Sequence, residues 1–84
     1  MLMDYLNQTE VFETSDLALA STLCYFGYKI EAINRENPNK SLFIFLRDEK
    51  IDDFIESFWK YELSVEPARF FGLTKEIKSR LYNN

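Results

Sequence analysis

Five consecutive apolar residues, L-F-I-F-L at positions 42–46, constrain the fold of this chain more than any other feature. A strand with one face in water alternates apolar and polar side chains, whereas an unbroken apolar run is typical of a strand buried on both faces. We therefore predict that residues 41–47 form the central strand of a small sheet, and that the rest of the chain covers both faces of this sheet.

The chain is 84 residues long, which suits a single small domain. It contains eight Phe, whose large rings supply much of the apolar area that a core of this size needs. Only two Gly and two Pro are present, so there is little room for linkers. We expect residues 1–8 to form a flexible N-terminal arm and residues 9–84 to form one α+β domain.

The residues before the central strand predict a strand, a helix and a second strand. Residues 10–13 suit a short edge strand. Thr14 or Ser15 is placed to cap a helix that ends near Phe26, and Asp16 favours the positive end of its dipole. Gly27 then ends the helix as a left-handed cap.

The segment 28–34 alternates apolar and charged side chains, which predicts a strand with one buried face. That face would carry Tyr28, Ile30 and Ala32. Residues 35–40 contain the turn-forming sequence N-P-N, so the chain is expected to return to the central strand as a hairpin.

Two helices are expected after the central strand. Asp48 is placed to cap a helix over residues 49–61, in which apolar side chains at i, i+3, i+4 and i+7 form one stripe: Ile51, Phe54, Ile55 and Phe58. Trp59 follows Ile55 by four residues and is expected to widen this stripe. Pro67 favours the first turn of a last helix that runs to about residue 82. The predicted order is β-α-β-β-α-α, with a three-stranded, mainly antiparallel sheet and three helices.

Charge is segregated along the sequence. The chain has a net charge of −4, which argues against simple binding of a polyanion. Residues 1–27 carry −4, residues 28–47 carry +2, residues 48–66 carry −5 and residues 67–84 carry +3. This distribution predicts a folded surface with separate acidic and basic regions.

The residue types exclude the commonest catalytic and metal chemistry. The chain has no histidine and one cysteine, so a Cys/His zinc site within one chain is excluded. No glycine-rich phosphate loop occurs. Cys24 suits a small buried side chain more than a reactive thiol. We therefore expect no catalytic residue, no metal and no cofactor.

Two surfaces are candidates for binding. An acidic and aromatic surface is a candidate for protein binding and comprises Asp52, Asp53, Glu56, Trp59 and Tyr61. Its acids, with Asp48 and Glu49, fit a solvated helix face better than a divalent-cation site. Its rings fit either the core or a stacking partner, with the core favoured. The second surface is a candidate for nucleic-acid binding if the hairpin and the last helix lie together, and it comprises Arg35, Lys40, Lys75, Lys78 and Arg80.

An ordered series of short motifs between residues 12 and 82 resembles a family of small bacterial and phage proteins, a domain of unknown function. The series reads F-x-T-S-D-L-x-L-A from Phe12, then G-Y, N-P, F-x-F and F-W, and closes with L-x-V-x-P-x-x-F-F from Leu63. The resemblance implies a shared fold and a phage or mobile-element setting. It implies no known activity and no catalytic residue.

The expected function is a small, non-enzymatic protein-interaction module, and a phage accessory or inhibitor protein is its specific version. The alternative is a nucleic-acid-associated protein that uses the basic hairpin and the last helix. The lone cysteine, the absence of a secretory leader in the first residues and the absence of a membrane-spanning apolar stretch favour a cytoplasmic protein with no membrane role. The sequence does not indicate an oligomeric state.

Overall fold

The computed structural model describes residues 10–83, so the arm predicted at residues 1–8 lies outside the described residues. The elements are β1 (Val11–Thr14), α1 (Leu17–Tyr25), β2 (Ile30–Asn34), β3 (Leu42–Leu46), α2 (Ile51–Trp59) and α3 (Pro67–Asn83). This confirms the predicted α+β class and the order β-α-β-β-α-α. Within the described part of the chain, no helix is both long and apolar enough to cross a membrane.

The sheet is antiparallel and has the order β1-β3-β2, so the apolar run forms the central strand as predicted. Phe45 on β3 lies between Phe12 on β1 and Ile30 on β2. Phe43 and Phe45 are the largest fully buried side chains of the core, at 2% and 0% exposure.

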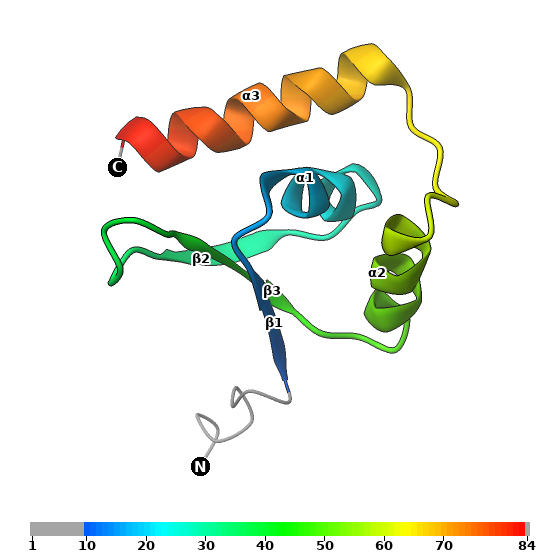
Figure 1. The fold of residues 1–84 in the computed structure, drawn as a ribbon, viewed down its shortest axis with the longest axis horizontal. Coiled ribbons are helices and arrows are strands. Elements are labelled where there is room, and N and C mark those ends of the chain that lie inside the picture. Colours follow the sequence, from blue (N-terminus) through cyan, green and yellow to red (C-terminus); the bar gives the residue numbers. More distant parts are fainter. Residues whose placement is uncertain (1–9, 84) are drawn as a thin grey trace.

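Only one face of the sheet is buried, so the prediction of cover on both faces is wrong for residues 10–83. Figure 1 shows α1 between the sheet and α3, with α2 beside them near the end of β3. On the opposite face Leu42 and Ile44 are half-buried, and Leu46 is 45% exposed. An apolar run thus forms a strand that is central in the sheet and covered on one side.

β2 carries a bulge that changes which of its residues face the core. Ile30 pairs with Phe45, but the register shifts between Ile30 and Ala32, so that Ile33 pairs with Phe43. Ala32 is therefore exposed, contrary to the prediction, and Ile33 takes the core side. One extra residue in a strand reverses the face of every side chain that follows it.

α1 is held at both ends by local hydrogen bonds. The cap is Asp16, whose Oδ1 accepts from the Leu19 N–H at 3.0 Å; Thr14 instead accepts from the Asp16 N–H. At the other end the Gly27 N–H donates to the Cys24 carbonyl, and Gly27 has a positive φ of 103°. The prediction that Gly27 ends this helix is confirmed.

α3 packs along α1 through both apolar and polar contacts. Ile77 belongs to the buried core, and the Thr74 hydroxyl donates to Oγ of the fully buried Ser21 at 3.0 Å. Thr74 also lies 3.1 Å from the Phe70 carbonyl of its own helix. α3 therefore turns one side to the core and leaves the opposite side to solvent.

Candidate protein-interaction surface

α2 has one side in the core and one side in solvent. Ile51 is fully buried, and the other three members of the predicted stripe are half-buried: Phe54, Ile55 and Phe58. Phe54 packs against Phe26, with ring centroids 5.2 Å apart. On the solvent side Asp52, Glu56 and Trp59 follow one another at i, i+4 and i+7, and all three are exposed. We call these three residues the α2 stripe.

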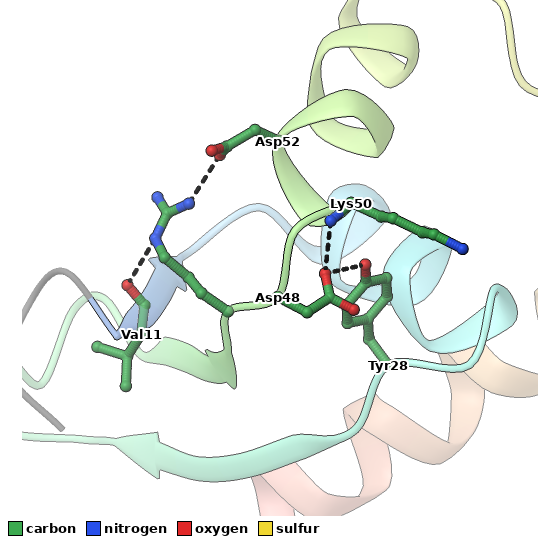
Figure 2. Close-up of polar contacts among 6 residues, drawn as sticks. Val11, Tyr28, Asp48, Lys50 and Asp52 are labelled. Atoms are coloured by element: carbon green, nitrogen blue, oxygen red, sulfur yellow. Dashed lines mark hydrogen bonds and ion pairs between the residues drawn. The ribbon is translucent and has the colours of Figure 1, made fainter. Parts of the chain in front are cut away.

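The start of α2 is tied to the sheet side of the molecule by Asp48. Its Oδ1 accepts from the Tyr28 hydroxyl at 2.6 Å and from the Lys50 N–H at 3.0 Å, as Figure 2 shows. Asp48 was predicted to cap α2. The prediction is wrong, because Lys50 occupies the N-cap position and its side chain makes no capping hydrogen bond. Asp48 instead stabilises the turn before the helix by accepting from the Lys50 N–H.

The Tyr28–Asp48 bond changes the protonation of both groups. Desolvation and the bond to Asp48 raise the pKa of Tyr28 to about 12. The hydrogen bond from Tyr28 and those from backbone N–H groups hold the pKa of Asp48 below its ordinary value. Both shifts favour a neutral phenol that donates to a charged carboxylate around neutral pH.

Arg47 links the end of β3 to the first turn of α2. Its Nη1 lies 2.7 Å from Oδ1 of Asp52, and its Nε donates to the Val11 carbonyl at 3.2 Å, as drawn in Figure 2. The guanidinium also lies 5.7 Å from the centre of the Phe12 ring. The side chain of Asp52 remains 74% exposed despite the ion pair, so this carboxylate is available to a partner.

α2 ends in the same motif as α1, but with a different residue in the left-handed position. The Tyr61 N–H donates to the Phe58 carbonyl, and the Glu62 N–H donates to the Ser57 carbonyl. This pattern needs a left-handed residue at Tyr61, where φ is 60°, and glycine is the residue that fits this conformation best. α1 has Gly27 at the equivalent position, whereas α2 has a tyrosine that is 95% exposed.

Trp59 lies in solvent next to this motif. It is 58% exposed and meets Phe58 edge to face, with ring centroids 4.9 Å apart. The favoured interpretation of Trp59 and Tyr61 as core residues is therefore wrong. A ring four residues after Ile55 lies at the border of the buried stripe, and here the border is open to water.

The acidic residues are separate and partly paired. Asp52 pairs with Arg47, and Glu56 pairs with Lys60 at 2.9 Å. Asp53 lies off the α2 stripe and lines a shallow hollow with Lys50, Phe54, Ser57 and Leu63. Among residues 10–83, no group of three or more acidic or Cys side chains is arranged to hold a metal ion.

The hairpin and the last helix do lie together. NH2 of Arg35 donates to the Arg80 carbonyl at 2.9 Å, near the C-terminal end of α3. Lys40 lies in the turn between β2 and β3 and lines a hollow with Ser41, Phe43 and Leu81, among others. Lys75 and Lys78 are exposed on the outer side of α3, so the five basic residues form two groups.

One row of exposed side chains on α3 was not predicted from the sequence. Phe71, Lys75, Lys78 and Tyr82 follow one another at i, i+4, i+7 and i+11 on α3, and we call them the α3 stripe. Phe71 is 62% exposed and Tyr82 is 79% exposed. The signal was the helical period itself, because these positions lie opposite the apolar side that contains Ile77.

Comparison with known proteins gives one match. The model of one protein family, described as Domain of unknown function (DUF5659), matches residues 9–83. No curated protein and no solved structure matches the chain.

Proposed function

The chain belongs to the DUF5659 family, a domain of unknown function, and we propose that it is a small, non-enzymatic module that binds another protein through α2. The binding surface consists of the α2 stripe together with Tyr61. The partner presents a basic surface.

The observation that carries this proposal is the left-handed, solvent-exposed tyrosine at the end of α2. A non-glycine residue in this conformation costs about 1–2 kcal/mol, and glycine would remove most of that cost. The exposed ring gains almost no burial in return. Strained residues concentrate at functional sites, and a tyrosine ring is a frequent anchor of protein interfaces.

The surroundings of Tyr61 indicate the chemistry of the partner. Trp59 and Tyr61 offer apolar rings with polar edges, and residues 48–66 carry a net charge of −5. Arginine side chains are attracted to both features, through ion pairs with the carboxylates and stacking over the rings. A basic protein segment therefore fits this surface better than an acidic or purely apolar one.

The proposed setting is the cytoplasm of a bacterium, with the chain acting as a phage or mobile-element accessory or inhibitor protein. The lone half-buried Cys24 supports a reducing compartment, because it has no second cysteine in the chain to pair with. The phage setting rests on the motif series between residues 12 and 82.

The proposal is tested by affinity capture from the native host with a tagged bait, followed by mass spectrometry. We expect a specific protein with a basic surface to be captured by the wild type and to be lost with Glu56→Lys and with Trp59→Ala. The matched control is Glu36→Lys, an equal charge change in the exposed hairpin turn. A captured protein that is retained by both α2 variants would contradict the proposal.

The second candidate function is nucleic-acid association, which the Arg35–Arg80 contact favours because it brings the basic hairpin to the end of α3. The contact also has a structural purpose, since a cation at the C-terminal end of a helix stabilises the dipole. The net charge of −4 opposes this candidate.

A further inference from the structure

The outer side of α3 presents aromatic rings and cations but no acid. The α3 stripe begins with Phe71, continues with Lys75 and Lys78, and ends with Tyr82. All four side chains are exposed, and they lie opposite Ile77, which joins the buried core. The stripe therefore points away from the core of its own chain and is open to a second molecule.

The α2 stripe has the complementary composition over the same length of helix, with the middle residue displaced by one position when the two helices run antiparallel. From N to C it reads acid, acid, ring: Asp52, Glu56, Trp59. Read from C to N, the α3 stripe gives cation, cation, ring: Lys78, Lys75, Phe71. Each set extends over seven residue steps, which is about 10 Å of helix. In an antiparallel arrangement Asp52 would face Lys78, Glu56 would face Lys75 and Trp59 would face Phe71.

We propose that the partner of the α2 stripe is the α3 stripe of a second copy of this chain, packed antiparallel to it. This inference rests on the proposed function of α2 and names its occupant. Two copies related by a twofold axis would use the contact twice, with α2 on α3 and α3 on α2. Such repetition enlarges an interface that is small when formed once between two short helical faces.

Charge complementarity supports a second copy as the occupant. Residues 48–66 carry −5 and residues 67–84 carry +3, so the two faces attract each other although each whole chain is negative. The carboxylates retain most of their exposure: the side chain of Asp52 is 74% exposed and that of Glu56 is 64% exposed. Their pairs with Arg47 and Lys60 lie at the surface and are weak enough to share a second cation.

The test begins with a concentration series of the full chain, from about 10 µM to about 1 mM, measured by analytical ultracentrifugation. Trp59 is the only tryptophan of the chain, so its fluorescence reports directly on this contact. We expect association beyond the monomer and a shift of the emission to shorter wavelength as Trp59 leaves water. A chain that stays monomeric over the whole range would overturn the inference.

A charge exchange then identifies the surfaces. Glu56→Lys alone and Lys75→Glu alone are each expected to weaken self-association at least about tenfold, because each places like charges opposite one another. An equal mixture of the two variants pairs the reversed Lys75 position with the reversed Glu56 position and keeps the natural pair in the other contact. The mixture is therefore expected to associate within about threefold of the wild type.

The controls are Glu36→Lys and Lys29→Glu, which make equal charge changes at exposed positions outside both stripes. They are expected to leave self-association unchanged. Circular dichroism and thermal unfolding verify that each variant is folded. Self-association that survives both reversals, or a mixture that fails to restore it, would show that other surfaces are used.

Failure of this inference is distinguishable from failure of the proposed function. If Lys75→Glu has no effect while Glu56→Lys removes a captured host protein, α2 binds a different partner and only the second copy is ruled out. Binding of nucleic acid by the α3 stripe, lost in Lys75→Glu and unaffected in Glu56→Lys, would also overturn the inference.

Discussion

At the scale of single residues, Tyr61 and Gly27 form a natural comparison. Both lie two residues after the last residue of a helix, both have a positive φ, and both support the same pair of backbone hydrogen bonds. Only the side chain differs. The chain thus uses glycine where the helix end serves the fold, and tyrosine where the helix end borders the proposed binding surface.

Tyr61→Gly is expected to stabilise the protein by about 0.5–1 kcal/mol. Relief of the left-handed strain is partly offset by the freedom that glycine gains in the unfolded chain. Urea unfolding measures the change. Gly27→Ala is the matched control: a Cβ at Gly27 meets no atom within 4 Å, so its expected loss of about 1 kcal/mol reflects backbone strain, partly offset by the lower freedom of alanine in the unfolded chain, and not a clash. A Tyr61→Gly protein less stable than the wild type would show that the ring contributes to the fold.

Tyr28 and Asp48 make stability depend on pH. The folded pKa of Asp48 is lowered, so its contribution is present above the ordinary carboxylate pKa and is lost as pH falls through the folded value. The folded pKa of Tyr28 is raised to about 12, so its contribution is present below the ordinary pKa of tyrosine and is lost as pH rises through about 12.

Tyr28→Phe removes the Tyr28–Asp48 hydrogen bond and with it this pH dependence of stability, in acid and in alkali. We expect the melting temperature of the variant to fall less than that of the wild type between about pH 5 and about pH 2, because the pKa of Asp48 returns toward its ordinary value. Thermal unfolding across this range measures the difference. Parallel curves for the two proteins would mean that the bond does not contribute in solution.

At the scale of elements, β3 has two unequal faces. Phe43→Ala and Phe45→Ala are each expected to cost about 3–5 kcal/mol, because both rings are buried in the core. Leu46→Ala, on the same strand with a 45% exposed side chain, is expected to cost less than about 1 kcal/mol.

Chemical denaturation measures these three variants. If either alanine variant fails to fold, Phe43→Leu or Phe45→Leu replaces it, with an expected cost of about 1–2 kcal/mol. Losses below about 1 kcal/mol at both Phe positions would contradict the central place of β3 in the core.

At the scale of the whole molecule, the charge pattern decides between the two candidate functions. We expect binding to mixed DNA and RNA oligonucleotides to be weaker than micromolar at about 0.15 M salt, because few phosphates are neutralised and the net charge of −4 repels the rest. Fluorescence anisotropy at two salt concentrations measures it.

Micromolar binding that weakens steeply as the salt concentration rises would support nucleic-acid association over protein binding as the function. In that case Lys78→Glu and Arg80→Glu are expected to weaken binding, whereas Lys29→Glu, an exposed base outside the two basic groups, is expected to have a smaller effect. The comparison separates specific use of the basic residues from a general effect of net charge.

The class, the order of elements and the central strand could all be predicted from the sequence. These features depend on local patterns: the apolar run at 42–46, the i, i+3, i+4, i+7 stripe from Ile51, and Gly27 after the first helix. Each pattern reflects a constraint that acts within a few residues of the chain, so it can be read without knowing the partners in space. The same helical spacing predicts that the acidic side chains of α2 lie off its apolar side.

Which of the predicted surfaces are buried depends on packing between elements and could not be predicted from the sequence. The phase of β2 depends on a bulge set by pairing with β3, and the open face of β3 depends on where the helices pack. The exposure of Trp59 follows from which side of α2 packs against the core. These features result from contacts between distant segments, and a local pattern of residue types does not contain that information.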